Sequence, residues 1–404
     1  MKKVLLAYSG GLDTSVILKW LLDNGYKVVC VIADVGQQEN LTDVKTKALS
    51  IGASKVHIVD LKGEFLENFI FKALKANVKY EGSYLLATAL ARPLISKKLA
   101  DIAKQEKTNI IAHGATGKGN DQVRFELAIY HHMPNAQIIA PWRDPAFYEQ
   151  FKGRTDLIKY ANAHGIPITS TLEKPYSIDE NLMHTSYEGG VIEDYTQPSP
   201  ADMFRHSVSP EQAPDEITPI SITFTKGTPT ALQLKKQGKK VTKPMALFTT
   251  LQQVAGENGI GRIDIIESRV IGTKSRGIYE SPAATVLWCA HADLEKLVLD
   301  KEVLKLKSEI EAKIAQLIYH GLWFSPEMDF LMAAINQSQQ KVCGTIHLSL
   351  YKGSCWVTHR ETPHPLHEMS LSSMDELGDY DQSDATGFIK TNALRFINNK
   401  GSDE

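Results

Sequence analysis

The sequence predicts an α/β fold: a doubly wound parallel-sheet domain, then a second domain of mixed α+β type and a C-terminal arm. Strand-length apolar runs alternate with helix-length segments through the first part of the chain, and parallel strands joined by crossover helices give that alternation. Prolines become frequent from Gly165, and apolar runs are sparse between Glu361 and Ala385. We therefore expect domains at 1–165 and 166–360, with an arm at 361–404.

The first domain is expected to contain five strands separated by helices. Apolar runs predict strands at 4–6, 28–33, 55–60, 109–113 and 136–140. Helical spacing predicts helices at 16–22, 40–51, 64–75, 87–106, 121–132 and 155–164. In a doubly wound sheet of order 3-2-1-4-5 the first and fourth strands are neighbours, at the point where a crevice opens for a ligand.

Two glycine-containing loops follow these two strands. Residues 7–15 read Ala-Tyr-Ser-Gly-Gly-Leu-Asp-Thr-Ser, and residues 114–120 read Gly-Ala-Thr-Gly-Lys-Gly-Asn. A glycine pair alone is more often only a turn, but a helix start beyond the glycines offers N–H groups and a partial positive charge to an anion. We expect Asp13, Thr14 and Ser15 to cap the first helix. Two such loops predict one shared crevice for a phosphate-bearing ligand.

Neither loop matches a common nucleotide motif. Ala112 stands where G-x-x-x-x-G-K-[ST] requires its first glycine, and Gly119 follows Lys118 in place of a hydroxyl residue. The first loop also lacks G-x-G-x-x-G. These differences argue against P-loop transfer of a γ-phosphate and against hydride transfer.

Composition limits the other function classes. The 404 residues carry a formal net charge of -2, so overall electrostatics gives no reason to expect a nucleic-acid or membrane partner. The four cysteines, at positions 30, 289, 343 and 355, show no C-x-x-C spacing and no matching histidine pattern, which argues against a zinc site or a thiol relay. Apolar runs are too short for a membrane span or a signal peptide. We expect a cytoplasmic protein.

The second domain is expected to start with a long loop at 166–216, punctuated by prolines, which is either disordered or functional. The dense charges of 259–282 fit either plain surface or a site for a substrate with both an amine and a carboxylate. The charge run at 300–313 predicts a solvated helix face.

The arm is expected to pack on a partner subunit, with a frayed terminus as the alternative. Hairpins are expected at 217–234 and 341–357, and helices at 245–255, 283–299, 301–318 and 326–336.

The first loop resembles the pyrophosphate loop (PP-loop) of the ATP pyrophosphatases, which cleave ATP between its α and β phosphates. Further segments are similar to those of the argininosuccinate synthase family, over nearly the whole chain. The second loop and the regions of Ser186 and Tyr279 are specific to that family. The segments are 84–88 (Tyr-Leu-Leu-Ala-Thr), 113–124 (His-Gly-Ala-Thr-Gly-Lys-Gly-Asn-Asp-Gln-Val-Arg), 180–187 and 272–279 (Gly-Thr-Lys-Ser-Arg-Gly-Ile-Tyr).

The resemblance implies an AMP-forming carbon–nitrogen ligase of arginine biosynthesis. Citrulline, aspartate and ATP, with Mg²⁺ on the phosphates, would give argininosuccinate, AMP and pyrophosphate. A ureido carbon has no leaving group, so its oxygen would first attack the α-phosphate, and the aspartate amine would then displace AMP from the citrulline adenylate. This route needs positioning and charge stabilisation but no enzyme nucleophile. A cytoplasmic homotetramer with small-molecule substrates, and with no metal ligand from protein side chains, is also implied.

The resemblance assigns ligand-binding residues at the matching positions. For ATP they are Ala7, Tyr8, Ser9, Gly10, Gly11, Leu12, Asp13, Thr14, Ser15, Ala33, Ala112, His113, Gly114, Ala115, Thr116, Gly117, Lys118, Gly119 and Asn120. For citrulline they are Tyr84, Thr88, Asn120, Arg124, Ser177, Ser186, Glu267 and Tyr279. For aspartate they are Thr116, Asn120 and Asp121.

The chemistry of three of these residues suits the assignments. An ionised Asp121 only accepts hydrogen bonds, so it suits the ammonium group of aspartate. Glu267 suits the α-amino group of citrulline, and Arg124 suits an anionic group.

Two departures from the family pattern stand out. Ala89 occupies the position where the family usually has a serine, so a contact from that side chain to the citrulline carboxylate is in doubt, and Thr88 or backbone N–H groups could replace it. Residues 359–367 differ from the family's usual glycine- and serine-rich pattern.

Two other functions share some of these features. A different PP-loop enzyme, such as a tRNA-thiolating or glutamine-dependent amidating enzyme, would want paired cysteines or an amidotransferase domain, and neither is visible. A nucleotide-sensing module without catalysis would need both loops, but not Arg124, Ser186, Glu267 and Tyr279 together.

Overall fold

A parallel sheet forms the first part of the computed structural model, which describes residues 1–117, 119–167, 176–375 and 378–397. Its five strands have the order β3-β2-β1-β4-β5, which confirms the predicted order. β1 pairs with β4, so the loops that follow them lie at one edge of the sheet. The strands are β1 (Lys3–Ala7), β2 (Lys27–Asp34), β3 (Lys55–Asp60), β4 (Ile110–Ala112) and β5 (Gln137–Ile139).

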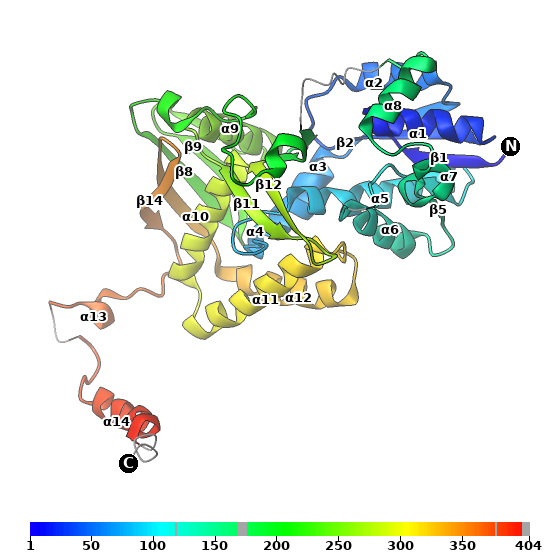
Figure 1. The fold of residues 1–404 in the computed structure, drawn as a ribbon. Coiled ribbons are helices and arrows are strands. Elements are labelled where there is room, and N and C mark those ends of the chain that lie inside the picture. The colour runs from blue at the N-terminus through cyan, green and yellow to red at the C-terminus, as the bar shows by residue number, and fades with distance from the viewer. Residues whose placement is uncertain (118, 168–175, 376–377, 398–404) are drawn as a thin grey trace.

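Helices cover both faces of this sheet (Figure 1). Val4 and Leu6 of β1 lie in a buried cluster with residues of α1 and α8, whereas Leu5 lies in another with residues of α5 and α6. Burial on both faces explains why the central strands β1, β2 and β4 are almost wholly apolar. The helices are α1 (Leu12–Asp23), α2 (Leu41–Ile51), α5 (Ala87–Gln105), α6 (Asp121–His132), η2 (Pro141–Arg143), α7 (Pro145–Tyr148) and α8 (Arg154–Ala163).

The helix expected at 64–75 is divided into α3 (Lys62–Phe65), a π-helical turn η1 (Leu66–Ile70) and α4 (Phe71–Lys75). Its aromatic side chains share the largest buried cluster with residues of the second half of the chain. Phe69 stacks on Trp323 with ring centroids 4.8 Å apart. This segment therefore packs into the core formed by the second half.

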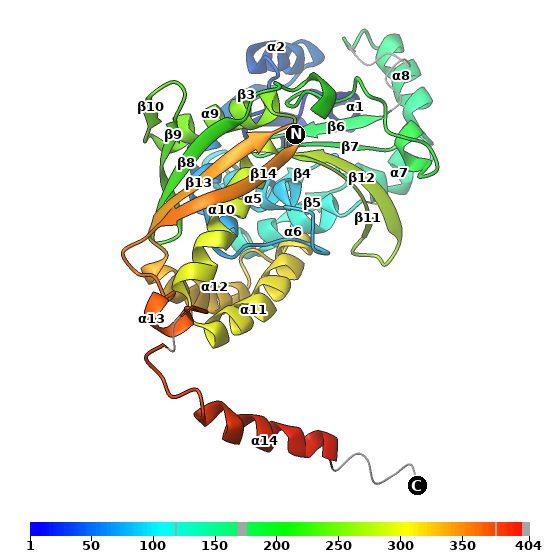
Figure 2. The same cartoon turned by 90° about the vertical axis from the view of Figure 1, so that its left-hand side faces the viewer.

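Two antiparallel sheets form the second half (Figure 2). Their strand orders are β11-β12-β7-β6 and β10-β9-β8-β13-β14. Both predicted hairpins are present, as β8–β9 and β13–β14. The strands are β6 (Ser177–Glu180), β7 (Thr185–Glu188), β8 (Thr218–Thr225), β9 (Thr228–Leu234), β10 (Lys239–Val241), β11 (Arg262–Ser268), β12 (Lys274–Glu280), β13 (Gly344–Tyr351) and β14 (Ser354–Glu361).

The smaller of these sheets was not expected from the sequence. β6 and β7 interrupt the proline-rich stretch, whose residues 168–175 lie outside the described part, and the charged segment 259–282 forms the β11–β12 hairpin. Polar residues such as Thr185 and Ser186 are buried on β7. The apolar alternation that marks a half-buried strand is therefore missing.

Helices of the second half match the predicted ranges closely. Lys307 on α11 departs from the predicted solvated face, because it is buried and pairs with Glu295 at 3.1 Å and Glu311 at 2.6 Å. The helices are α9 (Pro244–Glu257), α10 (Pro282–Val298), α11 (Lys301–Tyr319) and α12 (Pro326–Ser338), with short turns η3 (Gly190–Glu193), η4 (Pro210–Gln212) and η5 (Gln339–Lys341).

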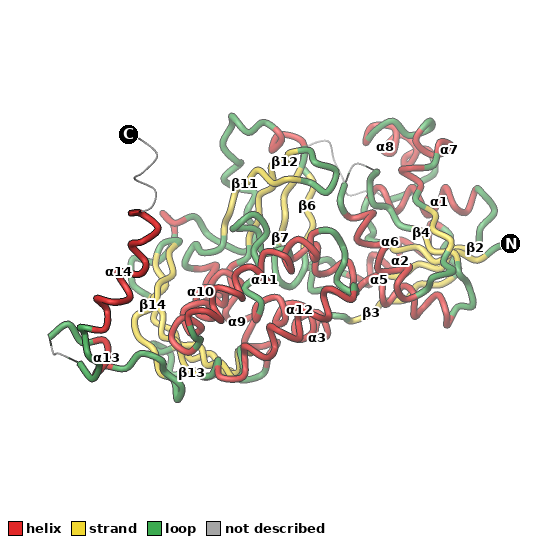
Figure 3. The backbone as a smooth tube through the Cα atoms, turned by 90° about the horizontal axis from the view of Figure 1, so that it is seen from below, coloured by secondary structure: helices red, strands yellow, loops and turns green. Residues whose placement is uncertain are grey.

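The arm follows β14 and extends away from the body of the molecule in three views (Figures 1, 2 and 3). It carries α13 (Met369–Ser372) and α14 (Asp384–Ile397), and α14 buries none of its residues. Phe388, Ile389 and Phe396 are exposed at 72%, 62% and 62%.

Among the described residues, no helix combines the length and apolar character that crossing a membrane requires.

Candidate active site

The first glycine loop connects β1 to α1. Gly11 is the N-cap of α1 and no side chain caps the helix, so the expected capping by Asp13, Thr14 or Ser15 is wrong. Instead, the hydroxyl groups of Ser9 and Thr14 lie 3.0 Å apart, and Tyr8 Oη lies 3.0 Å from Ser15 Oγ. Among the described residues, the N-cap Gly11 offers no side-chain acceptor to the start of α1, where free N–H groups would suit an anion.

Gly10 needs to be glycine for two reasons. Its φ is +79°, and a Cβ atom there would lie 2.7 Å from Cγ1 of Val44. Its carbonyl oxygen accepts a hydrogen bond from Lys47 Nζ at 2.8 Å. Lys47, which the sequence did not single out, therefore places a cation beside the loop.

The second loop follows β4 and meets the first. A Cβ atom at Gly114 would lie 3.0 Å from Cγ2 of Thr14, so the two loops lie against each other. His113 is buried, its Nε2 lies 3.0 Å from Glu126 Oε1, and its Nδ1 accepts from the Ala115 N–H. Both ring nitrogens are thus used in holding the loop. Lys118 lies outside the described residues.

Three further positions assigned to ATP lie on β2 and in the second loop. Ala33 lies near the end of β2, where its carbonyl oxygen accepts from Gln37. Thr116 and Gly117 are exposed, and Gln122 holds the loop by donating to the Gly117 carbonyl oxygen at 2.6 Å.

A hydrogen-bonded chain links the second loop to β11 through Tyr319. Asn120 Nδ2 donates to Tyr319 Oη at 2.8 Å, and that hydroxyl donates to Glu267 Oε1 at 3.0 Å. The side-chain oxygen Oδ1 of Asn120 accepts from the Val270 N–H at 3.1 Å. Asn120 and Glu267, two predicted site residues that are distant in sequence, are thereby linked through Tyr319.

Arg124 and Glu267 each have one buried polar atom with no hydrogen-bond partner in the described part of the chain, NH2 of Arg124 and Oε2 of Glu267. Arg124 otherwise donates to the Tyr319 carbonyl oxygen and to Asp121. Burial, with the negative charge of Glu188, raises the pKa of Glu267 to about 7. Unpaired buried polar atoms are costly, so these two indicate a ligand with complementary groups.

Asp121 lies between two guanidinium groups. Arg92 Nε lies 2.9 Å from Asp121 Oδ2, and Arg124 NH1 lies 3.0 Å from Oδ1. Burial alone would raise the pKa of Asp121, but the two guanidinium charges outweigh it and lower that pKa below its ordinary value. Asp121 therefore remains an ionised acceptor.

Aromatic rings form another side of the cluster. Tyr84 stacks on Tyr279 with centroids 4.3 Å apart, and His184 lies parallel to Tyr279 at 5.8 Å. Thr88 Oγ1 lies 2.8 Å from His184 Nε2. Burial, and then the charge of Arg92, lowers the pKa of His184 to about 3, so the imidazole is neutral.

The two predicted serines differ in position. Ser186 on β7 is buried, pairs with Tyr279 on β12, and donates to the Asp179 carbonyl oxygen at 3.4 Å. Ser177 is exposed on β6, where it pairs with Glu188. Ala89 is fully buried in the largest apolar cluster.

Several residues of the cluster were missed from the sequence. Arg92 follows Thr88 by one helical turn, which places both on one face of the helix. From this spacing, Arg92 could have been predicted as a site residue. Tyr319 could not be predicted as a site residue, because an aromatic residue at the end of an amphipathic helix is expected to be part of the hydrophobic core. Asp179 could not be predicted either, because only its strand pairing brings it to the site.

Comparison with known proteins bears on this geometry. A family model described as the arginosuccinate synthase N-terminal HUP domain matches residues 3–167, and the C-terminal domain model of the same family matches residues 176–398. The chain belongs to the argininosuccinate synthase family. The predicted family, enzyme class and α/β architecture are confirmed.

Relatives in this family match over nearly their full length. The argininosuccinate synthase of Thermotoga maritima is 52% identical over 98% of this chain and 96% of its own. That of Gallus gallus is 49% identical over 97% and 94%, and that of Danio rerio is 48% identical over 97% and 95%.

Proposed function

We propose that this ligase joins citrulline to aspartate through a citrulline adenylate, in the crevice between the two glycine loops and the β11-β12-β7-β6 sheet. One observation carries the proposal: Arg124 and Glu267, buried and oppositely charged, each keep a polar atom without a partner. A zwitterionic amino acid has the carboxylate and the ammonium group that satisfy these two atoms. Family membership supports the same reaction.

ATP lies across the two glycine loops in this proposal, on the residues that the family resemblance assigns to it. The uncapped N-terminus of α1 suits the departing pyrophosphate, because its N–H groups and helix dipole stabilise negative charge. Lys47, beside Gly10, adds a positive charge at the same place. His113 contributes by holding the second loop in shape.

Citrulline lies beside the Tyr84–Tyr279 stack, with its carboxylate at Arg124 and its ammonium group at Glu267. Thr88, Asn120, Ser177 and Ser186 complete its assigned set. The ureido oxygen attacks the α-phosphate and pyrophosphate leaves. No side chain forms a covalent bond, so the chain accelerates the step by orientation and by stabilising charge.

Aspartate then binds with its amine at Asp121 and its carboxylates at Thr116 and Asn120. The guanidinium groups that keep Asp121 ionised support its role as the acceptor for the amine. Attack of the amine on the activated carbon releases AMP and forms the new carbon–nitrogen bond.

Magnesium enters with ATP in this proposal. Mg²⁺ usually keeps several waters and binds substrate phosphates with few protein ligands.

The remaining assignments concern assembly and location. We propose a cytoplasmic homotetramer, with domains at 1–165 and 166–360 and contacts made by the arm at 361–404. The exposed apolar side chains of α14 support a role for the arm in contacts between subunits.

Isotope exchange between pyrophosphate and ATP, without aspartate, tests the proposal. Labelled pyrophosphate is expected to enter ATP only when citrulline is present, and Arg124→Ala is expected to lose exchange far more than ATP binding. Equal loss of both would contradict the role of Arg124. Exchange without citrulline would favour another PP-loop enzyme. No exchange, together with no AMP formed when citrulline and aspartate are both supplied, would favour a nucleotide-sensing module.

A further inference from the structure

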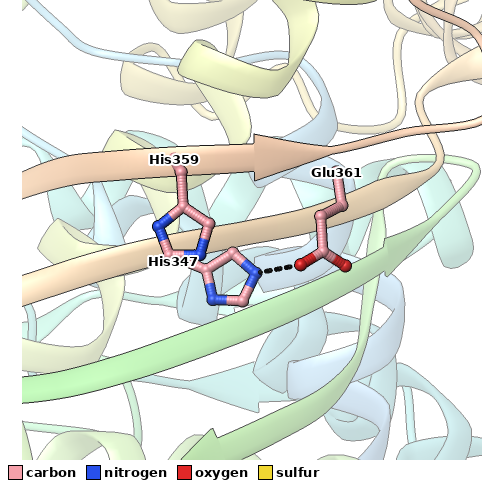
Figure 4. A group of neighbouring side chains, drawn as sticks. All are labelled: His347, His359 and Glu361. Atoms are coloured by element: carbon pink, nitrogen blue, oxygen red, sulfur yellow. Dashed lines mark hydrogen bonds and ion pairs between the residues drawn. The ribbon is translucent and has the colours of Figure 1, made fainter.

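β13 and β14 carry two histidines and a glutamate close together, outside the candidate active site (Figure 4). His347 on β13 faces His359 on β14, and their rings stack with centroids 3.8 Å apart. Glu361 is two residues after His359, so both side chains lie on one side of β14. His347 Nε2 lies 2.9 Å from Glu361 Oε1, and one donor atom from each residue lies within 4.8 Å of the others.

A break in strand register brings the two imidazoles together. Leu348 faces Val357, but His347 faces His359, so Thr358 has no partner across the strands. Such bulges re-aim side chains. With regular pairing Thr358 would face His347, and His359 would point to the other side of the sheet.

Thr358 also determines which nitrogen of His359 is free. Its hydroxyl group donates to the His347 carbonyl oxygen at 3.2 Å and lies 3.1 Å from His359 Nδ1. Because the hydroxyl proton is used on the carbonyl, the hydroxyl oxygen accepts from Nδ1–H. The Nε2 atom of His359 then carries a free lone pair, the arrangement found where a second residue orients a metal-binding histidine.

His347 offers its Nε2 atom from the opposite strand. Its Nδ1 is buried and has no hydrogen-bond partner among the described residues, so Nε2, beside Glu361, is the nitrogen that an ion can reach.

We propose that His347, His359 and Glu361 bind a divalent transition-metal ion, with Zn²⁺ as the expected ion. Two imidazoles with one carboxylate are zinc-type donors, whereas Mg²⁺ and Ca²⁺ prefer oxygen alone. Zinc–nitrogen bonds of about 2.0–2.1 Å require donor atoms about 3.4 Å apart. Because imidazole lone pairs lie in the plane of the ring, the exposed His359 would have to turn out of its stack on His347, and the exposed Glu361 would have to move closer, to bind the same ion. A fourth position would be left open.

The sequence pattern gives no sign of this site, because the histidines are distant in sequence and meet only through strand pairing. Two of its ligands fall in 359–367, the segment that differs from the usual family pattern. A bound ion would tie β13 to the strand from which the arm departs. Binding would move the His347 proton from Nε2 to the buried Nδ1, which has no partner among the described residues, so the affinity is expected to be moderate.

Titration of the chelator-treated full chain with Co²⁺, without nucleotide, tests the site. One equivalent is expected to give visible absorption bands that Zn²⁺ removes, and Zn²⁺ is expected to raise the thermal midpoint. Because loss of an outer-shell partner alone costs about 10–100-fold, His359→Gln and Glu361→Gln are each expected to weaken binding at least about tenfold. Both side chains are exposed, so both variants should fold.

A matched control variant completes the experiment. His364→Gln, at an exposed histidine of the same segment, should bind as the original chain does. Unchanged Co²⁺ binding by His359→Gln would overturn the proposal. So would the absence of binding at millimolar Co²⁺ by a chain that shows its normal circular dichroism and thermal transition.

Discussion

Arg92 and Asp179 form an ion pair, with NH2 of Arg92 2.5 Å from Oδ2 of Asp179. This pair joins α5, which packs on the parallel sheet, to β6 of the smaller antiparallel sheet. The same guanidinium group binds Asp121 at the start of α6. One side chain therefore fixes the distance between the proposed aspartate site and the strands that carry the proposed citrulline site.

Replacing Arg92 should separate these two sites functionally. In Arg92→Gln, Asp121 loses one of the two guanidinium groups that orient it. Because small misplacements of reacting groups are costly, kcat/KM for aspartate is expected to fall at least about tenfold. Binding of ATP should change little. Steady-state kinetics with each substrate varied in turn measures this. An equal loss for ATP and aspartate would indicate a general folding defect instead.

Glu267 gives the expected pH dependence. Because its pKa is raised to about 7, the carboxyl group is neutral below that pH and cannot pair with the citrulline ammonium group. kcat/KM for citrulline should therefore rise as pH increases through 7 and then level off. Glu267→Gln should lose most of its activity, and its remaining kcat/KM for citrulline should no longer rise through pH 7. A rise that persists in the variant would assign the titration to another group.

Glu267 should also affect the free energy of unfolding, which is expected to fall with rising pH while kcat/KM for citrulline rises. Between about pH 4.5 and 7 the folded chain keeps a proton that the unfolded chain has lost, so Glu267 lowers the free energy of unfolding as pH rises through that window. Glu267→Gln should thus gain stability over the original chain, by up to about 3 kcal/mol at pH 8 and little at pH 5. Urea unfolding at both pH values measures it. Glu257→Gln, at an exposed glutamate, is the control.

Gly10 and Gly25 form a matched pair for the first loop. Both have φ of +79°, but only at Gly10 would a Cβ atom meet another residue, Val44 at 2.7 Å, whereas nothing lies within 4 Å at Gly25. Gly25→Ala should cost only the left-handed strain of about 1–2 kcal/mol and keep its KM for ATP. Gly10→Ala should also raise the KM for ATP about tenfold or more, through displacement of the loop. Equal KM values for ATP in Gly10→Ala and Gly25→Ala would contradict the assignment of the first loop to the ATP site.

The arm predicts a change in assembly without a change in fold. Phe388→Asp places a charge on the exposed apolar side of α14, so the sedimentation coefficient should fall toward that of a smaller species, while the thermal transition of the body is kept. Thr391→Asp, on the same helix and also exposed, should sediment as the original chain does. Unchanged sedimentation of Phe388→Asp would contradict the proposed role of the arm.

The parallel sheet could be predicted almost completely, because strands buried on both faces are apolar runs such as Val28 to Ala33. The smaller antiparallel sheet could not, since Thr185 and Ser186 are buried polar residues whose hydrogen bonds replace apolar contacts. Arg124 and Glu267 were assigned by family resemblance, and the structure brings them together through Tyr319. Tyr319 itself and the pair of His347 with His359 depend on helix packing and strand register. Such relationships leave no local pattern.

Transfer of oxygen from citrulline to AMP tests the central claim most directly. The chain is incubated with ATP, Mg²⁺, aspartate and citrulline labelled with ¹⁸O in its ureido group, and the AMP is analysed by mass spectrometry. Because the ureido oxygen attacks the α-phosphate, the account predicts one labelled oxygen in each AMP formed with argininosuccinate. Unlabelled AMP formed together with argininosuccinate would contradict the adenylate route.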